Sequence, residues 1–335
     1  KALVKVFKRN LIFHEEILED IRARYAKRGI EMPAINQNQA LLPQGATFFA
    51  NKSGSAVGIC IAENGRVFVS LPGVPTEMKQ ILLDDVLPYL QNMKAVAGIK
   101  VVKLRTTGIF ESRLAEKIVP GLKLETGVKL AYLPSWGGVD LRILASGENN
   151  DEAAEKAQNV VRYLESVCGK YIYGKDDDTL EGVVGQLLKV NDKTLSVAES
   201  CTAGQLGMLI TSVPGSSAYF LGGVIAYSND IKIEQLSVDA DIIAQHGAVS
   251  EQCAVAMAKG CRKLLGSDYA LSITGIAGPE GGSDDKPVGT TFIGLSSAHA
   301  TYARKFNFGT VRQSNRSRAA YAALELLRRE ILDIT

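Results

Sequence analysis

The C-terminal half of the chain alternates short apolar runs with longer segments of helical periodicity. The predicted strands are 195–198, 223–227 and 269–273, and the predicted helices are 180–190, 202–211 and 250–265. Two further apolar runs, 288–295 and 301–308, are close enough to pair as an antiparallel hairpin before a last helix. This alternation is typical of a layered α/β fold, and we expect an α/β/α domain.

The pattern between about residue 98 and residue 172 is different. Its expected elements are strands at 100–106 and 139–145 and helices at 111–118 and 151–167. Alternating strands beside amphipathic helices predict a small α+β unit. The polar run 174–178 is predicted to be a surface linker.

The N-terminal region predicts a partial α/β domain. Residues 14–28 form an amphipathic helix with Ile17, Leu18, Ile21 and Tyr25 on one face. A strand is expected at 67–71, followed by a helix to about residue 89 that Thr76 caps, with Glu77 in its first turn. The expected domains are therefore 1–97, 98–172 and 173–335.

Composition and charge change this picture little. A chain of 335 residues predicts two or three domains, and 46% hydrophobic and 22% charged residues are typical of soluble globular proteins. The net charge of +2 and the pI near 8.2 do not indicate the strongly basic surface that nucleic-acid-binding proteins usually have, so no nucleic-acid partner is expected.

The five cysteines are odd in number and form no CxxC pair. We therefore expect reduced thiols rather than a disulfide framework or a zinc site. The sequence has no charged-then-apolar leader and no apolar run of membrane-spanning length. This predicts a cytoplasmic protein that does not contact a membrane.

The segment AESCTAG at 198–204 places Ser200 on a predicted strand-to-helix turn. Amides at a helix start lack intrahelical partners and carry partial positive charge, which suits an anion or an oxyanion. Ser200 is therefore the leading candidate nucleophile, and the alternative is a simple N-cap. Cys201 is the rival nucleophile, because a thiol at a helix start tends towards thiolate, unless it is a small buried core residue.

The base is expected to be a lysine, because the chain has only three histidines, and His246, placed just before a helix, is interpreted as structural. Lys232 and Tyr227 follow a predicted strand and so belong to the same sheet edge as Ser200. A desolvated lysine loses its proton more readily and can then accept the serine proton. The alternative is a solvated surface lysine.

Two further features point to the same edge. The glycine-rich loop 274–282 follows an apolar strand, although it can also be only a long connection. Arg312, Arg316 and Arg318 begin the last helix and are candidates for a phosphate clamp, or else ordinary surface charges. Ligands of open α/β sheets bind outside the carboxyl ends of the strands, where these segments are expected to meet.

Four segments together resemble the C-terminal domain of the CinA family of competence/damage-inducible proteins. They are AESCTAG at 198–204, PGSSAYFLGGVIAYSNDIK at 214–232, QHGAVSE at 245–251 and SITGIAGPEGGSDDKPVGT at 272–290. The resemblance covers about residues 180–333 and preserves motif order and spacing. In that family the domain is an amidohydrolase that converts nicotinamide mononucleotide to nicotinate mononucleotide and ammonia, in pyridine nucleotide salvage.

The resemblance implies a role for each matching residue. Ser200 would be the nucleophile, Lys232 its base and Tyr227 an orienting partner. The expected substrate contacts are the amides of Cys201 and Thr202, then Thr274, Gly275 and Arg312, with Arg316 as a second phosphate contact. The amidase would need no metal or organic cofactor, and the family suggests a homodimer acting on a small nucleotide.

The rest of the chain shows weaker resemblances. ALLPQGAT at 40–47 and LPGVPTEMK at 71–79 are similar to the later half of the family's molybdopterin-binding-like domain. The earlier half, with its GGLGPT motif, is missing from this sequence. A divalent metal is expected only with an intact domain of this kind, and we expect no ADP-ribose hydrolysis from this sequence.

TTGIFESRLAEKI at 106–118 resembles the family's KH-like middle domain. A KH module clamps nucleic acid with a Gly-x-x-Gly loop, which is absent here, so a spacing or association role is expected. Two alternatives to the amidase remain open. One is a competence- or DNA-damage-associated interaction protein with a vestigial pocket, and the other is an ADP-ribose pyrophosphatase.

Overall fold

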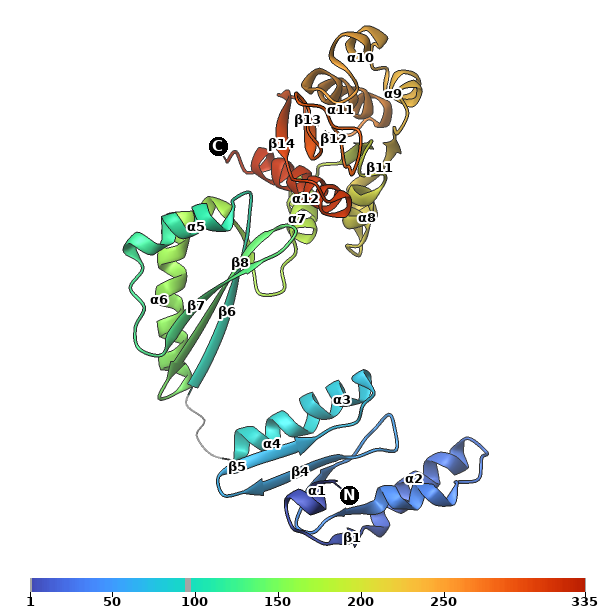
Figure 1. The fold of residues 1–335 in the computed structure, drawn as a ribbon, viewed down its shortest axis with the longest axis vertical. Coiled ribbons are helices and arrows are strands. Elements are labelled where there is room, and N and C mark those ends of the chain that lie inside the picture. The colour runs from blue at the N-terminus through green and yellow to red at the C-terminus, as the bar shows by residue number, and fades with distance from the viewer. Residues whose placement is uncertain (1, 94–97, 335) are drawn as a thin grey trace. The chain divides into compact units, whose positions relative to one another are not determined.

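The computed structural model describes residues 2–93 and 98–334. The chain divides into two compact units between residues 96 and 97 (Figure 1). Each unit has its own hydrophobic cores. The domain boundary expected between residues 97 and 98 involves residue 97, which lies outside the described residues.

The first unit contains two small antiparallel sheets, β1–β2 and β3–β4–β5. Its elements are α1 (Ala2–Val6), β1 (Leu11–Phe13), α2 (Glu15–Lys27), β2 (Leu41–Pro43), β3 (Thr47–Phe49), β4 (Gly58–Glu63), β5 (Arg66–Ser70), α3 (Pro75–Ile81) and α4 (Leu87–Asn92). Helix α2 buries Ile17, Leu18 and Ile21, as its periodicity predicts. The expected Thr76 cap is wrong: Val74 occupies the N-cap, because Pro75 has the fixed φ that suits the first helical position.

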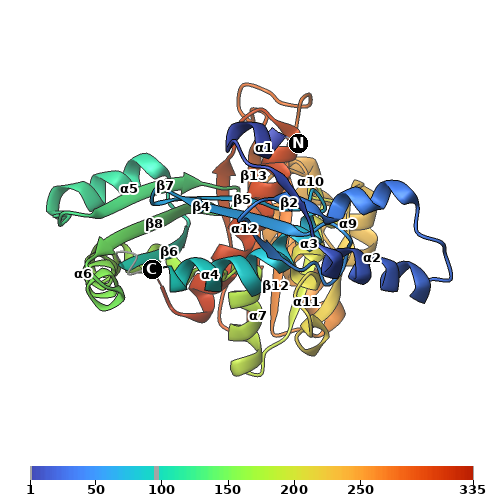
Figure 2. The same ribbon diagram turned by 90° about the horizontal axis from the view of Figure 1, so that it is seen from below.

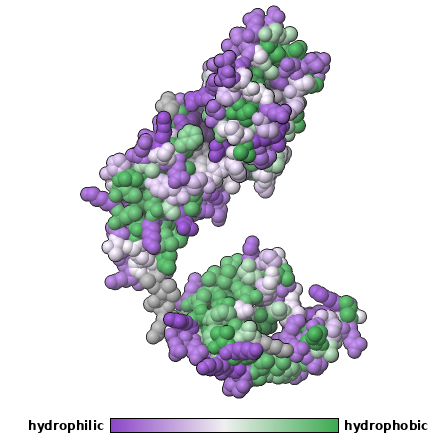
Figure 3. Space-filling view, viewed as in Figure 1, coloured by the Kyte–Doolittle hydropathy of each residue, from purple (hydrophilic) through white to green (hydrophobic). Residues whose placement is uncertain are grey.

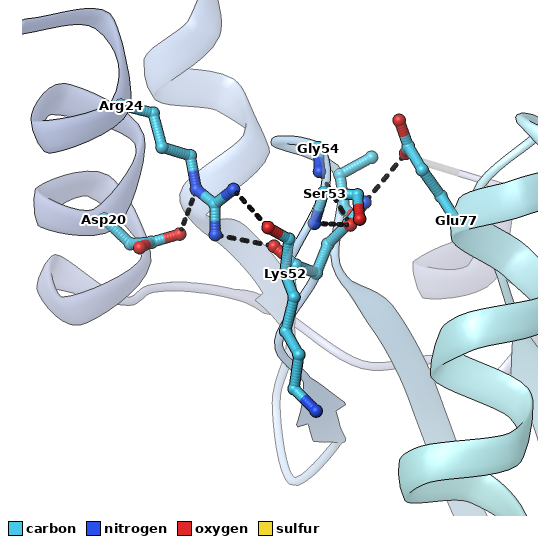
Figure 4. Close-up of polar contacts among 8 residues, drawn as sticks. Asp20, Arg24, Lys52, Ser53, Gly54 and Glu77 are labelled. Carbon is cyan, nitrogen blue, oxygen red and sulfur yellow. Dashed lines mark hydrogen bonds and ion pairs between the residues drawn. The ribbon is translucent and has the colours of Figure 1, made fainter. Parts of the chain in front are cut away.

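A polar network holds the loop after β3 between α2 and α3 (Figure 4). The Asn51 side chain accepts a hydrogen bond from the Gly54 amide at 2.7 Å and donates one to Glu77 at 2.8 Å. Arg24 donates to the carbonyl oxygens of Asn51 at 2.6 Å and Lys52 at 3.1 Å. Glu77, expected only as a first-turn charge, therefore also fixes a loop.

The second unit begins with a four-stranded antiparallel sheet in the order β7–β8–β6–β9. Its elements are β6 (Gly98–Thr107), α5 (Glu111–Ile118), β7 (Val128–Pro134), β8 (Gly138–Gly147), α6 (Asn150–Cys168) and β9 (Ile172–Lys175). Helices α5 and α6 pack on the sheet through one core, as expected of an α+β unit. The predicted linker is wrong at its start, because Gly174 and Lys175 hydrogen-bond to β6 as part of β9.

The C-terminal domain is a five-stranded sheet in the order β11–β10–β12–β13–β14. Its elements are α7 (Leu180–Val190), β10 (Leu195–Glu199), α8 (Gln205–Thr211), β11 (Phe220–Ile225), α9 (Asn229–Leu236), α10 (Ala240–His246), α11 (Glu251–Leu265), β12 (Tyr269–Gly275), β13 (Thr290–Ser296), β14 (Thr301–Asn307) and α12 (Arg312–Ile331). Strands β10, β11 and β12 are parallel, and β13 and β14 form the predicted antiparallel hairpin.

Helices cover both faces of this sheet (Figure 1, Figure 2). One core joins the sheet to α7, α8 and α12, and the other joins it to α9 and α11. The predicted α/β/α fold is confirmed. The pattern did not predict α9 and α10, which have only eight and seven residues, and His246 ends α10 shortly before the predicted helix, α11.

The five cysteines are buried free thiols, as expected. No helix within the described ranges is long and apolar enough to cross a membrane. The face of the C-terminal domain seen in Figure 3 is largely hydrophilic, with single apolar residues between the polar ones.

Candidate active site

The candidate residues lie at the carboxyl edge of the parallel strands. The Ser200 amide donates to the Ile273 carbonyl oxygen of β12 at 2.9 Å. The Ala226 amide, just after β11, donates to the Glu199 carbonyl oxygen of β10 at 2.8 Å. The chain segments that leave β10, β11 and β12 therefore lie side by side, which is where open α/β sheets bind ligands.

Glu199, which the sequence analysis did not single out, organises the turn that carries Ser200. Its carboxylate is buried and accepts hydrogen bonds from the amides of Gly204 at 3.0 Å, Leu206 at 3.1 Å and Gly207 at 2.8 Å. The amides of Gly204, Leu206 and Gly207 are therefore occupied by the protein's own carboxylate. The sequence contained a signal for this role, because Glu199 is an acidic residue just before a predicted helix start.

Helix α8 begins at Gln205, later than the predicted start at Thr202. Ala203 and Gly204 have φ values of 49° and 93°, and this left-handed backbone delays the helix. Gly204 is the N-cap, so Ser200 does not cap the helix. The amides of Cys201 and Thr202 donate to no backbone carbonyl oxygen of the described residues.

We expect Glu199→Gln to lower the free energy of unfolding by about 1–3 kcal/mol, since an amide NH₂ would face backbone N–H groups that now share a carboxylate. Urea unfolding followed by circular dichroism measures this change. Glu251→Gln, an exposed acidic residue in the first turn of α11, is the matched control and should change stability little. Equal stability of both variants would contradict the proposed role of Glu199.

Lys232 is almost fully buried, with 1% of its surface exposed. Its Nζ donates to the carbonyl oxygens of Ala226 at 2.9 Å, Tyr227 at 3.2 Å and Ser228 at 3.3 Å. Burial lowers the pKa of Lys232 from its ordinary 10.5, and the buried thiols of Cys253 and Cys201 oppose this only in part. The alternative of a solvated surface lysine is therefore wrong.

No hydrogen bond joins Ser200 Oγ to Lys232 Nζ among the described residues. The two side chains nevertheless belong to adjoining segments of one sheet edge, because residue 226, which binds Nζ, is also hydrogen-bonded to the residue before Ser200. An amine with three carbonyl acceptors has all three ammonium hydrogens engaged, and it must lose one proton before it can act as a base.

Cys201, the rival candidate nucleophile, is buried next to Ser200 in the chain. It belongs to the core between the sheet and α12, and burial raises the pKa of its thiol to about 11. Arg312 and Arg316 lower this pKa, but desolvation dominates. The thiol is therefore protonated at neutral pH and acts as a core residue.

Arg312, the first residue of α12, connects two loops of the site. Its Nη1 donates to the Gly278 carbonyl oxygen at 2.8 Å, and its Nη2 lies 3.4 Å from the Tyr227 hydroxyl. Thr274 is buried and donates its hydroxyl hydrogen to the Ala248 carbonyl oxygen at 2.7 Å. The glycine-rich loop, Tyr227 and the start of α12 thus meet at one place.

Arg316, expected as a second phosphate contact, donates from its Nη2 to the Thr202 carbonyl oxygen at 2.7 Å. Its Nε is buried without a partner among the described residues. Asn315, which the sequence analysis missed, donates to the Ala277 and Gly309 carbonyl oxygens at 3.0 and 2.9 Å and so fixes the glycine-rich loop. The sequence analysis considered only the arginines of this segment and so overlooked Asn315, which lies one position before Arg316.

Gly275, expected as a substrate contact, lies where β12 packs closely against β13. A Cβ at this position would lie 2.7 Å from Thr291 Oγ1 on the neighbouring strand β13. Arg318, the third arginine of the predicted clamp, turns away and donates to the Phe308 carbonyl oxygen at 3.0 Å. Of the three arginines, Arg312 alone joins both loops of the candidate site.

The fold and this edge define an α/β protein with a serine, a buried lysine and an arginine beside a glycine-rich loop. The profile of the CinA C-terminal domain matches residues 177–331, and that of the damage-inducible protein CinA KH domain matches residues 102–174. A CinA-like protein of Cytophaga hutchinsonii is 41% identical over 335 residues, covering 100% of this chain and 80% of its own. The chain belongs to the CinA family.

A second relative, a CinA-like protein of Rippkaea orientalis, is 41% identical over 339 residues and covers 99% of this chain and 81% of its own. Among solved structures, the competence/damage inducible protein CihA from Agrobacterium tumefaciens is 33% identical. It covers 44% of this chain and 92% of its own, with a TM-score of 0.44.

Proposed function

We propose that the C-terminal domain is an amidohydrolase that converts nicotinamide mononucleotide to nicotinate mononucleotide and ammonia. The observation that carries the proposal is a fully buried lysine, Lys232, on the same sheet edge as Ser200. Burying an amine is unfavourable, and a lowered pKa is the property that a lysine base requires. The family resemblance supplies the substrate.

In the proposed reaction, Ser200 Oγ attacks the carboxamide carbon and Lys232 Nζ accepts the hydroxyl proton. The tetrahedral intermediate then collapses, and the proton passes from Lys232 to the departing ammonia, which leaves an acyl-serine. Water, deprotonated by Lys232, hydrolyses this ester and releases the carboxylate. These steps need no metal ion or organic cofactor.

The three carbonyl contacts of Lys232 suggest how the base works. A neutral amine has two hydrogens and one lone pair, so it keeps two of the three carbonyl contacts and directs the lone pair elsewhere. We propose that the lone pair turns to Ser200 Oγ when substrate is bound. Catalytic hydrogen bonds that are long in the absence of substrate commonly shorten in the substrate complex.

The remaining residues are proposed to bind the substrate. The amides of Cys201 and Thr202 would stabilise the oxyanion, since no carbonyl of the described residues accepts from them. Arg312 would bind the phosphate, and Thr274, whose hydroxyl oxygen retains acceptor capacity, would contact the nicotinamide. Arg316 would act indirectly by holding the Thr202 carbonyl oxygen.

Incubation of the full chain with nicotinamide mononucleotide tests the proposal directly. Ammonia release, measured with glutamate dehydrogenase, should match the nicotinate mononucleotide separated by chromatography. Activity should survive chelation by EDTA, because no step uses a metal. Absence of ammonia release would favour the alternative of an interaction protein with a vestigial pocket.

We expect Arg312→Ala to raise the KM for nicotinamide mononucleotide about tenfold or more, because a charge-assisted contact to phosphate contributes about 1.5–3 kcal/mol. The kcat/KM for nicotinamide riboside, which lacks the phosphate, should change much less. Arg142→Ala, on the exposed side of β8, is the control variant. An equal loss for both substrates would contradict phosphate binding by Arg312.

Cys201→Ala should keep most of the deamidase rate, since the thiol is protonated at neutral pH and packed in the core. Iodoacetamide should likewise leave turnover largely unchanged. Steady-state rates with and without the reagent measure both effects. Loss of turnover in the variant, with unchanged thermal stability, would show that Cys201 is the nucleophile and Ser200 is not.

A further inference from the structure

The second unit has a cavity of about 670 Å³, formed where loops of the middle domain meet β14 and α12. This volume falls within the range of about 300–1,000 Å³ that small-molecule sites occupy. None of the described residues that line it is Ser200, Tyr227, Lys232, Thr274 or Arg312. The cavity is therefore separate from the candidate active site.

At the walls of this cavity, glycines of the middle domain lie close to side chains of α12. A Cβ on Gly108, whose φ is +73°, would lie 3.0 Å from Glu325 Oε1 on α12. A Cβ on Gly137 would lie 3.1 Å from the Tyr321 ring. Arg328 on α12 also donates to the carbonyl oxygen of Lys170 at 2.7 Å, so the two domains are joined by direct contacts.

Aromatic rings line the cavity from both domains. Phe110 and Trp136 are 72% and 54% exposed, although such large apolar side chains are usually buried. Tyr321 lies on α12, and Phe306 and Phe308 stack in parallel with their centroids 5.5 Å apart. Exposed rings around a cavity provide faces on which a planar ligand stacks.

The charged residues of the lining are mostly cationic. The lining contains the cations Arg304, Lys305, Arg318 and Arg329 and two acidic residues, Glu111 and Glu325. Arg328 and Arg329 each hold the Glu325 carboxylate at 2.7 Å, which leaves Arg304, Lys305 and Arg318 against Glu111 alone. The cavity therefore combines an excess of positive charge with stacking surfaces, which together suit an anion that carries a planar ring.

We propose that this cavity binds a nucleotide, with the base on the rings of Phe110 and Trp136 and the phosphate on Arg304 and Arg318. A mononucleotide fits better than a nucleic-acid strand, because the cavity is of small-molecule size and the middle domain lacks the Gly-x-x-Gly loop of a KH clamp. The site is proposed for binding only, and it stands independently of the deamidase reaction.

Trp136 is the only tryptophan of the chain, so its fluorescence reports on this cavity alone. Titration of the full chain with AMP, excited at the red edge of tryptophan absorption, should quench the emission saturably. Adenosine and inorganic phosphate, which each carry one of the two features, should bind at least about tenfold more weakly. No saturable change with AMP, or equal binding of adenosine, would overturn the proposal.

Two exposed positions provide variants that leave the core intact. Phe110→Ala and Arg304→Gln should each weaken AMP binding about tenfold, and Lys263→Gln, an exposed cation on α11, should not. Ser200→Ala should bind AMP as the wild type does, which separates this test from that of the deamidase. Unchanged affinity in the first two variants, or tighter binding of a single-stranded oligonucleotide that AMP does not displace, would refute a nucleotide site.

Discussion

Ser200→Ala is expected to lower kcat for nicotinamide mononucleotide deamidation by about 10³-fold or more, because it removes the atom that would form the acyl intermediate. The turn should persist without the hydroxyl. Its geometry comes from Glu199 and from the Ser200 backbone amide, neither of which the substitution changes. Single-turnover measurements of ammonia release, with substrate binding followed by calorimetry, separate lost chemistry from lost affinity.

Ser212→Ala is the matched control for this prediction. Ser212 is an exposed serine of the same domain whose hydroxyl bonds only to the Leu209 carbonyl oxygen at 2.7 Å among the described residues. It should retain the wild-type rate. A Ser200→Ala protein that folds, binds substrate and still releases ammonia at the wild-type rate would eliminate the acyl-serine route.

Lys232→Met should lower kcat by about 10²–10⁴-fold, the usual contribution of a general base, while it keeps the apolar stem in the core. Lys232→Arg should be no better, because a guanidinium stays protonated and cannot accept the serine proton. Lys259→Met, an exposed lysine of α11, is the control. Wild-type rates in both Lys232 variants would show that another group is the base.

The pH dependence of the reaction rate tests the role of Lys232 independently. Burial lowers its pKa below 10.5, and only the neutral amine can take a proton. The wild-type rate should therefore be low on the acidic side, where the amine is charged, and should rise as pH increases through the lowered pKa. A kcat that falls as pH rises through the lowered pKa of Lys232 would contradict the assignment of Lys232 as a base.

The local pattern predicted several elements to the residue. The bounds of α5 (Glu111–Ile118) and α7 (Leu180–Val190) agree with the prediction, because their periodicity and flanking residues are contained in the segment itself. The start of α8 was wrong, because its delay depends on left-handed backbone at Ala203. Strand β9 was missed because its pairing partner, β6, is about seventy residues away in the sequence.

The candidate residues were also found from the sequence, but their environments were not. Ser200 and Lys232 each follow a predicted strand, and parallel strands present their carboxyl ends at one edge of a sheet. The occupation of the α8 amides by Glu199 was not predicted, because a carboxylate beside a helix start has the same pattern whether it points to solvent or to those amides.

The sequence by itself determined the family, the layered fold and which chemical groups stand at the carboxyl edge of the sheet. It did so because periodicity and motif spacing are properties of neighbouring residues. Only the tertiary structure decided that Lys232 is desolvated, that Arg312 joins two loops, and that aromatic and cationic side chains of two domains line a cavity of small-molecule size. Burial and enclosure arise when distant segments pack together, and no local pattern of residues contains that information.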